Sequence, residues 1–522
     1  MKTRLRLVTT VGTLLYAFAS AASADWTDDI GYTALRARLG AATPSALGID
    51  VSQVEAASDG AYMPDINNPT FAPEFAGKTI SAKSGASAPS SHATTVARYY
   101  YGRVTSIATD IDPIDVYEAN NWLNSGMLRV GTAFAPLTES RRAESHSWIG
   151  SLGTDALDAD VLRRLDLVAQ RDGVVFAVGV NNGGGSAMPH LLCSAYNALA
   201  VGLTNGASSY GPTSVDVAGR VKPDIVVPMS LTSWATPVVA SSASLLLQTA
   251  DAEGILPQLA AQERKTAKAL LVRALLMAGA TKTEFADWRK GFASPSTDGT
   301  VPLDFRFGAG ELNIDNSHRI LTAGEQHAGA SADVAPTGWD YDTAAAGSDR
   351  LYFFEIPAFR YADTVSILVA WNRQIAVGGG NPAKLTPSLA NIDLRLYAAS
   401  GYMVGAAWDQ SISAIDNVEH IYLRWLPPGR YAMAVTSDKT WNYALAWDIH
   451  TSPTAADDFD GDGDVDLADF NFMQSCFNGP NRPPQSGGCE GADLDGDSDV
   501  DLSDFFQFQL CFNGPNRPPK CL

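Results

Sequence analysis

One stretch of the sequence, residues 231–250 (LTSWATPVVASSASLLLQTA), restricts the possible folds more than any other. Beyond its first turn it has almost no polar face, so a helix formed here must be buried on most of its surface. Ser233 stands at the position of an N-cap, with Thr236 and Pro237 in the first turn, where a missing N–H costs little. The sequence therefore predicts a central helix that begins with a hydroxyl in the positive field of its dipole.

Ser233 has two interpretations on the residues alone. Serine and threonine cap many helices and have no further role there. Free backbone N–H groups at the start of a buried helix also stabilise an oxyanion, and this makes Ser233 a candidate nucleophile. The neighbouring residue types leave both interpretations open.

The order of the letters is more specific. TSWATPVVASSASLL resembles the serine motif of the subtilisin-like serine proteases, GTSMATPxVAGxAAL, and VKPDIVVP at 221–228 resembles the KPDIxAP strand that precedes it in that family. The resemblance covers about residues 30–325. It implies a doubly wound, mostly parallel α/β sheet and a serine endopeptidase that acts on protein or peptide substrates. The chain departs from the family pattern at Leu231, which replaces the glycine before the Thr-Ser pair.

A predicted strand ends on an acidic residue well ahead of the serine motif. In GIDVSQVEAASDG, the apolar residues Ile49, Val51 and Val54 precede Glu55 in a pattern typical of a strand. The resemblance matches Glu55 to the aspartate of the family's first catalytic strand. Without the resemblance, Glu55 is an ordinary surface acid at a strand end.

The segment SSHATTVARYYYG at 90–102 supplies a histidine between the acid and the serine. His92 begins a helical pattern, and the segment resembles the family's HGTHVAG motif, with Ala93 and Thr95 in place of a glycine and the second histidine. Most single histidines are structural or solvated. The resemblance makes His92 the catalytic base. His146 and His190 are its rivals within the same domain, but neither begins a matching motif.

A buried strand is predicted within GVVFAVGVNNGGG at 173–185, after a helical pattern at 158–173. Strands that alternate with helices indicate a parallel sheet, and ligands bind at the carboxyl ends of its strands. Asn181 and Asn182 follow this strand. The resemblance assigns Asn181, together with the backbone N–H of Ser233, to binding the oxyanion, although Asn-Gly runs are also ordinary turns.

The resemblance implies a Glu-His-Ser triad. His92 would take the proton from Ser233 as its hydroxyl attacks, and Glu55 would hold the imidazole in the right tautomer. Glutamate is one methylene longer than aspartate, which moves the carboxylate by about 1.5 Å and requires the strand or the histidine to be displaced. The alternative is an inactive relative that serves as a scaffold or binding protein, as Glu55 and Leu231 suggest. A third alternative, a purely structural docking protein, would not explain why the three motifs follow one another in catalytic order.

The pattern changes to period two after the predicted peptidase domain. Ile392, Leu394 and Leu396 alternate with polar or aromatic residues, and four further segments behave in the same way. Several such strands joined by Gly, Pro and Asn turns predict an antiparallel β-sandwich. The predicted strands are TVSILVAW, NIDLRLYA, HIYLRWL, YAMAVTS and YALAWDI.

The last part of the chain contains two copies of one acidic loop, about 35 residues apart. Aspartates at loop positions one, three, five and twelve gather hard oxygen ligands around Ca²⁺, and a duplicated register makes a merely solvated acidic run a poor explanation. Position seven would use its carbonyl, and position nine is also acidic. In this order the predicted ligands are Asp458, Asp460, Asp462, Asp469, Asp464 and Asp466 in the first loop and Asp493, Asp495, Asp497, Asp504, Asp499 and Asp501 in the second.

Each loop is followed by a helix with Phe and Leu, and the pair resembles a type I dockerin. Ser498 replaces the turn glycine of the second loop, and the CFNGPNRPP segments are foreign to the usual module. The resemblance implies a Ca²⁺-folded module that docks to a surface or scaffold partner. Four cysteines of this region are predicted to form disulfides, with three possible pairings. Because each pair follows one repeat, the simplest pairing is Cys476–Cys489 and Cys511–Cys521.

Composition excludes some classes of function. The net charge is −20, and residues 457–522 carry thirteen Asp and one Glu against two Arg and one Lys. Such an acidic balance argues against nucleic acid as a partner. A basic start, an apolar run and Ala22-Ser23-Ala24 predict a signal peptide and export, and no later apolar run suggests a membrane anchor. The predicted parts are a signal peptide at 1–24, a peptidase domain at 25–335, a β-sandwich at 336–450, a linker at 451–457 and a calcium-binding module at 458–522.

Overall fold

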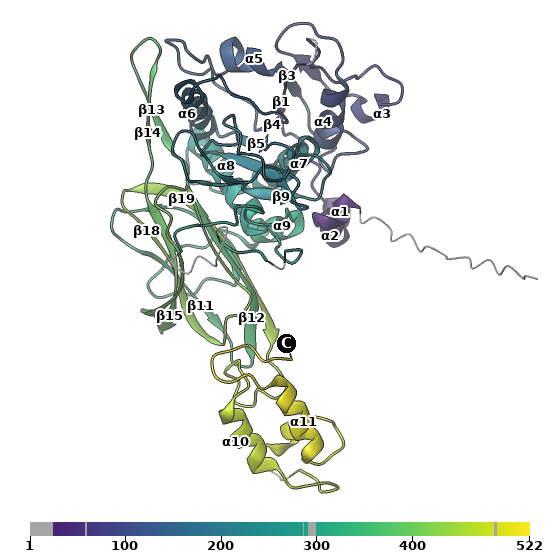
Figure 1. Cartoon of the computed structure of the whole chain (residues 1–522), viewed down its shortest axis with the longest axis vertical. Coiled ribbons are helices and arrows are strands. Elements are labelled where there is room, and N and C mark those ends of the chain that lie inside the picture. Colours follow the sequence, from purple (N-terminus) through teal and green to yellow (C-terminus); the bar gives the residue numbers. More distant parts are fainter. Residues whose placement is uncertain (1–24, 58–59, 286, 291–298, 485–487, 522) are drawn as a thin grey trace, which may run out of the picture.

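The structure is a computed structural model that describes residues 25–57, 60–285, 287–290, 299–484 and 488–521. The predicted signal peptide at 1–24 lies outside the described residues. Figure 1 shows three parts along the long axis: an α/β part, a β-sandwich below it, and a small helical part, drawn in yellow, at the lower end. None of the helices in the described ranges has the length and apolar character that a membrane span needs.

A seven-stranded sheet forms the centre of the first part. Its order is β2-β3-β1-β4-β5-β6-β9, and each neighbouring pair is parallel. The chain adds β2 and β3 on one side of β1 and then continues with β4 on the other side, so the winding reverses between β1 and β4. Ligands of such sheets bind outside the carboxyl ends of the strands at this reversal. The strands are β1 (Val51–Glu55), β2 (Ile80–Ala82), β3 (Ile114–Glu118), β4 (Ala143–His146), β5 (Val175–Gly179), β6 (Ala198–Leu203) and β9 (Ile225–Val227).

Helices cover both faces of this sheet, because the strands are apolar on both sides and must be shielded from water. One face packs against α4 (Ser91–Tyr101), α7 (Thr232–Ala252) and α8 (Ala261–Ala278), and the other against α6 (Asp155–Asp172) and η2 (Trp122–Gly126). The predicted doubly wound α/β fold is therefore confirmed. The remaining elements of this part are short: α1 (Trp26–Asp29), α2 (Tyr32–Leu39), η1 (Gly40–Ala42), α3 (Ala72–Phe75), α5 (Ala119–Asn121), β7 (Gly211–Pro212), β8 (Val221–Lys222) and α9 (Ile314–Ala323).

The central helix α7 is buried along most of its length, as its sequence predicts, but its start differs from the prediction. Leu231, with extended φ and ψ of −140° and 147°, is the N-cap, and Ser233 is the second helical residue. The cap is supplied from another segment, since Asn182 Oδ1 accepts a hydrogen bond from the Thr232 N–H at 2.9 Å. Pro237 consequently lies inside the helix rather than in its first turn.

The predicted antiparallel β-sandwich is confirmed. Its two sheets have the orders β10-β19-β12-β17 and β11-β18-β15-β16, and their inner faces share one apolar core. Helix α8 separates the sandwich from the parallel sheet and packs against β12 and β19, so the two parts share a continuous core. The strands are β10 (Thr337–Ala344), β11 (Arg350–Ile356), β12 (Arg360–Ala370), β15 (Ile392–Ser400), β16 (Met403–Ser411), β17 (Val418–Leu423), β18 (Gly429–Ser437) and β19 (Trp441–Pro453).

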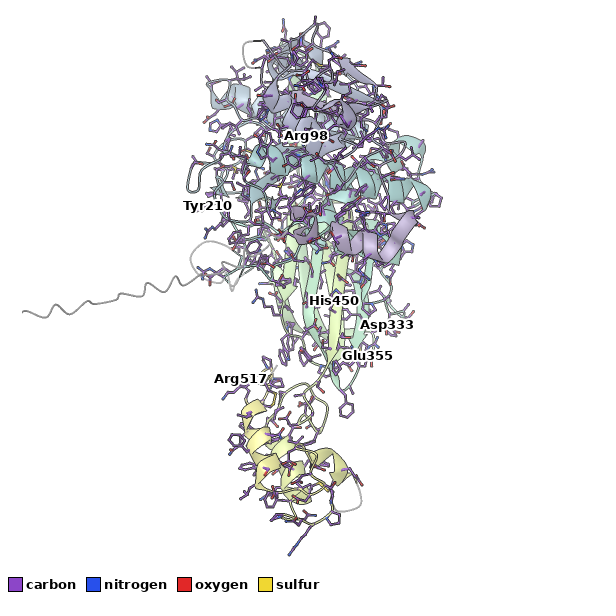
Figure 2. All side chains as sticks on the ribbon, turned by 90° about the vertical axis from the view of Figure 1, so that its right-hand side faces the viewer. Arg98, Tyr210, Asp333, Glu355, His450 and Arg517 are labelled. Carbon is purple, nitrogen blue, oxygen red and sulfur yellow. A yellow bond between two sulfur atoms is a disulfide. The ribbon has the colours of Figure 1, made fainter. Side chains whose placement is uncertain are left out.

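Two features of the sandwich lie outside the sequence prediction. The hairpin of β13 (Gln374–Gly378) and β14 (Lys384–Ser388) leaves the sandwich and packs against α6, where Leu167 meets Ile375 and Leu385. Strand β19 continues to Pro453, so the first residues of the predicted linker are part of the sheet. The side-chain view in Figure 2 places the labelled His450 on the sandwich, near this extension.

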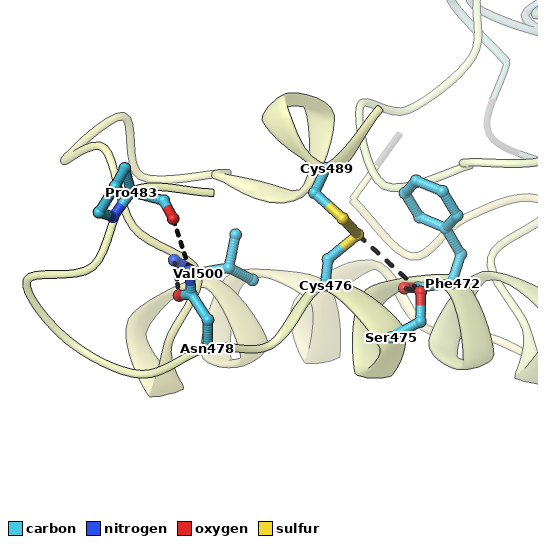
Figure 3. Close-up of a disulfide and its surroundings, with 7 residues drawn as sticks. All are labelled: Phe472, Ser475, Cys476, Asn478, Pro483, Cys489 and Val500. Atoms are coloured by element: carbon cyan, nitrogen blue, oxygen red, sulfur yellow. Dashed lines mark hydrogen bonds between the residues drawn. A yellow bond between two sulfur atoms is a disulfide. The ribbon is translucent and has the colours of Figure 1, made fainter. Parts of the chain in front are cut away.

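The C-terminal part consists of α10 (Leu467–Cys476), η3 (Cys489–Ala492) and α11 (Leu502–Cys511). Disulfides join Cys476 to Cys489 (Figure 3) and Cys511 to Cys521, which is the simplest of the three pairings. Each CFNGPNRPP segment forms a hydrogen bond with the acidic loop of the other repeat. The Asn478 N–H donates to the Val500 carbonyl of the second loop at 3.1 Å, and the Asn513 N–H donates to the Val465 carbonyl of the first loop at 3.0 Å.

Candidate active site

The carboxyl edge of the parallel sheet carries all four predicted site residues. Glu55 is the last residue of β1, Asn181 follows β5, and His92 and Ser233 are each the second residue of a helix, α4 and α7. Parallel strands place their carboxyl ends at one edge of a sheet, which explains how positions so distant in sequence become neighbours. The structure joins Glu55 to His92 directly, and it places Asn181 and Ser233 around one pocket.

Glu55 and His92 form the closest contact of this group. His92 Nδ1 and Glu55 Oε2 lie 2.7 Å apart, with the Glu55 side chain 2% exposed and the His92 side chain 41% exposed. The hydrogen bond to the carboxylate raises the pKa of His92, and partial burial opposes this shift. The additional methylene of glutamate therefore leaves the acid within hydrogen-bonding distance of the imidazole.

Gln53 holds the Glu55 carboxylate in place by a hydrogen bond. It lies two residues before Glu55 on β1, and alternate residues of a strand point to the same face. Gln53 Nε2 donates to Glu55 Oε1 at 2.7 Å and to the Ala93 carbonyl at 2.9 Å, while its Oε1 accepts from the buried Tyr101 hydroxyl at 2.6 Å. Sequence reasoning missed Gln53, although a buried polar residue on the same strand face as Glu55 was a usable signal.

Aromatic side chains line the imidazole. The rings of His92 and Trp234 have centroids 5.4 Å apart, and Trp234 in turn lies 6.3 Å from Tyr99, which contacts Trp26 at 5.9 Å. Trp234 directly follows Ser233 in α7, so it connects the start of α7 with the start of α4. This packing restricts the position of the imidazole and leaves part of it accessible to a substrate.

Ser233 borders a cavity of about 110 Å³ that also contacts the ends of β4 and β5. Because Pro237 has no N–H, the Ser233 carbonyl lacks its partner in the helix, and the Ser147 hydroxyl donates to it instead at 3.1 Å. In the ranges the structure describes, no hydrogen bond joins the Ser233 hydroxyl to His92. The cavity is lined by Ser147, Trp148, Ile149, Gly179, Val180, Asn181, Asn182, Thr232 and Ser233.

The two asparagines after β5 have different surroundings. The Asn182 side chain accepts from Thr232 and fixes the start of α7. Asn181 is held through its backbone, since its N–H donates to Ser209 Oγ at 3.0 Å and its carbonyl accepts from the Ser209 N–H at 2.8 Å. No hydrogen bond occupies the Asn181 side-chain amide within the described part of the chain, which leaves the amide available to a ligand in the cavity.

His146 and His190 occupy different environments. His146 is fully buried, contacts Glu144 at 3.0 Å, and burial lowers its pKa to about 3, so it is inaccessible to a substrate. His190 belongs to a second Ser–His–Asp chain that sequence reasoning missed. Its Nδ1 lies 2.8 Å from Asp158 Oδ2, and its Nε2 lies 3.3 Å from the hydroxyl of the exposed Ser214. Ser214 borders none of the cavity beside Ser233.

The predicted calcium loops bring their carboxylates together. Asp458, Asp460 and Asp469 place one oxygen each within 4.8 Å of one another, and Asp493, Asp495 and Asp504 do the same in the second loop. These clusters could hold a cation. In the first loop, desolvation and neighbouring carboxylates raise the pKa of Asp458, Asp460 and Asp469.

Positions seven and nine of each loop have structural partners. Asp464 Oδ2 accepts from the Asn516 N–H at 2.5 Å, and Asp499 accepts from the Asn481 N–H in the other repeat. The side chains at position seven therefore bind the CFNGPNRPP segments. This leaves the backbone carbonyls at position seven available as Ca²⁺ ligands, as predicted. Asp466 and Asp501 form capping boxes with the aspartates at position twelve, at the starts of α10 and α11.

Ser498 adopts a strained backbone conformation. Its φ is +74°, in the left-handed region, and the equivalent Gly463 has φ +92°. Replacing Ser498 with glycine is expected to stabilise the second loop by about 1 kcal/mol, because the left-handed region is costly for a residue with a Cβ. Hydrogen exchange of the amides at 493–504 measures this change. The matched variant Gly463→Ser should destabilise the first loop, since its Cβ would lie 2.5 Å from Pro428 Cδ. An unchanged exchange rate in Ser498→Gly would contradict the strain.

Comparisons with known proteins find distant structural likeness only. No family model and no curated protein matches the chain. The prenylagaramide maturation protease PagA is 19% identical over 52% of this chain and 92% of its own, with a TM-score of 0.32. A mutant of the protease domain of PatA is 16% identical over 54% and 97%, with a TM-score of 0.34. A cold adapted subtilisin-like serine proteinase is 19% identical over 47% and 86%, with a TM-score of 0.31.

Proposed function

We propose that the protein is a serine endopeptidase of the subtilisin-like type with a Glu55-His92-Ser233 triad. The observation that carries this proposal is the 2.7 Å hydrogen bond between Glu55 and His92 at the carboxyl edge of the sheet, beside the helix start that bears Ser233. The chain order of acid, histidine and serine and the motif around Ser233 support the same activity. The substrates are proteins or peptides.

Each residue of the group has a chemical role in this proposal. His92 takes the proton from the Ser233 hydroxyl as it attacks the scissile carbonyl and returns it to the leaving amine. Glu55 accepts from His92 Nδ1, which leaves Nε2 free to act as the base and stabilises the imidazolium that forms. The Asn181 amide and the Ser233 N–H stabilise the oxyanion, since neither has another partner among the described residues. Water then hydrolyses the acyl-enzyme.

A second candidate is an inactive scaffold, and one observation favours it. The Ser233 hydroxyl has no hydrogen bond to His92 in the structure, although such contacts are often long in a free enzyme and shorten with substrate. The two candidates differ in turnover. The full chain, incubated with calcium and an unfolded protein such as reduced casein, should generate new amino termini, and His92→Ala should abolish them. Equal cleavage by His92→Ala, or none by the wild type, would support the scaffold.

The two asparagines offer a matched test of the oxyanion site. Asn181→Ala should lower kcat about 10²–10³-fold with little effect on stability, because its amide is free until the transition state forms. Asn182→Ala removes the cap of α7 and should lower the free energy of unfolding by about 1 kcal/mol. Peptide hydrolysis and thermal unfolding of both variants measure the difference. A larger loss of kcat in Asn182→Ala would reverse the two assignments.

We further propose that the C-terminal part binds two Ca²⁺ ions and attaches an exported enzyme to a surface or scaffold partner. The first ion would be held by the carboxylates of loop one and the second by those of loop two, which would offset the repulsion among the clustered aspartates. Exposed apolar side chains on α10 and α11 offer a docking surface: Leu467 is 65% exposed and Leu502 is 72% exposed. Calorimetric titration of calcium into the chelator-treated chain should give two sites, and a single site would restrict binding to one loop.

A further inference from the structure

A mixed group of ligating side chains lies where the chain passes from α9 to the sandwich. Glu325 and His327 belong to the segment that follows α9, and Asp340 belongs to β10. The segment is held along β10, since the Gln326 N–H donates to the Trp339 carbonyl at 2.8 Å. One ligand atom from each of the three side chains lies within 4.8 Å of the other two.

Two buried tyrosines fix the position of the Asp340 carboxylate. Asp340 has no exposed surface, its Oδ2 accepts from the Tyr352 hydroxyl at 2.8 Å, and the Tyr443 hydroxyl lies 2.5 Å from that of Tyr352. The other carboxylate oxygen of Asp340 lies 3.1 Å from His327 Nδ1. Metal ligands are characteristically oriented by such hydrogen bonds from the residues around them.

Glu325 contributes an independent observation. Its Oε1 is inaccessible to solvent and has no hydrogen-bond partner among the described residues. A buried carboxylate oxygen without a partner is unfavourable, and such atoms in a native protein call for a cation, a proton or a bound water.

Arg350 of β11 pairs with a different carboxylate. Arg350 is engaged by Asp342, with its Nε 2.7 Å from Asp342 Oδ2. His327 is a basic side chain beside both carboxylates. It is 69% exposed, and its Nδ1 lies 3.1 Å from Asp340 Oδ1. The buried Asp340, the half-buried Glu325 and the exposed imidazole of His327 therefore lie together at the junction, and an ion can reach the group from the side of the imidazole.

We propose that Glu325, His327 and Asp340 form a binding site for one Zn²⁺ ion, with solvent as the fourth ligand. An imidazole nitrogen with two carboxylates suits zinc, whereas Ca²⁺ takes oxygen ligands. Bonds of about 2.0 Å in a tetrahedral site place two ligand atoms about 3.3 Å apart, close to the observed 3.1 Å between His327 and Asp340. Zinc would replace the proton between these two side chains, and Glu325 would move in to complete the site. The ion would fasten the segment after α9 to β10.

Zinc binding to the full chain tests this site, with calcium in excess so that the acidic loops are occupied. Equilibrium dialysis followed by metal analysis should find one more bound zinc per chain in the wild type than in His327→Ala, at micromolar free zinc. His327 is largely exposed, so its removal should leave the circular dichroism spectrum of the zinc-free chain unchanged. Glu325→Gln should weaken the same site at least about tenfold, because a neutral amide replaces a charged ligand.

His450→Ala is the matched control. His450 Nε2 lies 3.0 Å from Asp448 Oδ2 on the same sandwich, so it is another exposed imidazole paired with one carboxylate. This variant should bind as much zinc as the wild type. Equal zinc content in wild type and His327→Ala would overturn the proposal, as would an equal loss in His450→Ala. Both measurements are made without substrate, so their outcome is independent of the peptidase proposal.

Discussion

Replacing Ser233 with alanine is expected to lower kcat for peptide hydrolysis by about 10⁶-fold, with KM almost unchanged. In the proposed mechanism this hydroxyl forms the acyl bond, so alanine at this position removes the nucleophile. Substrate contacts along the cavity remain, so binding should persist. Steady-state hydrolysis of a fluorogenic peptide, with active-site titration of the wild type, measures the effect.

The neighbouring hydroxyl of Ser147 serves as the control for this substitution. Ser147 donates to the Ser233 carbonyl and not to a reacting atom, so Ser147→Ala should disturb the start of α7 without removing the nucleophile. Its kcat should therefore fall far less than that of Ser233→Ala. Losses of equal size in the two variants would mean that the integrity of the helix start, and not a nucleophilic serine, determines activity.

Glu55→Gln is expected to lower kcat about 10⁴-fold and to displace the acidic limb of the pH profile toward lower pH. The base works only when His92 is neutral. The Glu55 carboxylate raises the pKa of His92, so wild-type activity is lost as the pH falls through this raised value. Glutamine removes the negative charge, which lowers the pKa of His92 and keeps the imidazole neutral in more acidic solution. The profile of kcat/KM against pH measures both effects.

Glu55→Asp is the matched variant because it retains the charge and shortens the side chain by one methylene. The carboxylate would withdraw by about 1.5 Å from a histidine that lies 2.7 Å away in the native protein. Its kcat should lie between those of the wild type and Glu55→Gln, and its acidic limb should remain closer to that of the wild type. An Asp variant as active as the wild type would mean that the distance between acid and imidazole is not critical.

The pattern of residues within short segments of the sequence was sufficient to predict much of this fold. The apolar residues before Glu55 predict β1, whose five residues are all buried, and the apolar run of α7 predicts a buried helix. Both patterns depend only on which residues face a core. The disulfides at Cys476 and Cys511 follow from cysteine spacing within each repeat. Each of these features is encoded within a short segment.

Features that depend on distant partners escaped prediction. Ser233 was predicted to be the N-cap of α7, but Asn182, fifty residues away in sequence, caps the helix instead. The need for a Ser147 donor at the Ser233 carbonyl arises only once Pro237 is known to lie inside the helix. The chain Tyr101–Gln53–Glu55 likewise exists only after α4 has packed on β1.

A fluorophosphonate probe reports whether Ser233 is an activated nucleophile, because the probe reacts with a serine only where a base activates the hydroxyl. Peptide mapping by mass spectrometry after labelling should find the adduct on Ser233 in the folded, calcium-loaded chain. The label should be absent from His92→Ala and retained in Ser214→Ala, the variant that breaks the other Ser–His–Asp chain. An adduct on Ser214, or no adduct on Ser233 in the folded protein, would contradict the assignment.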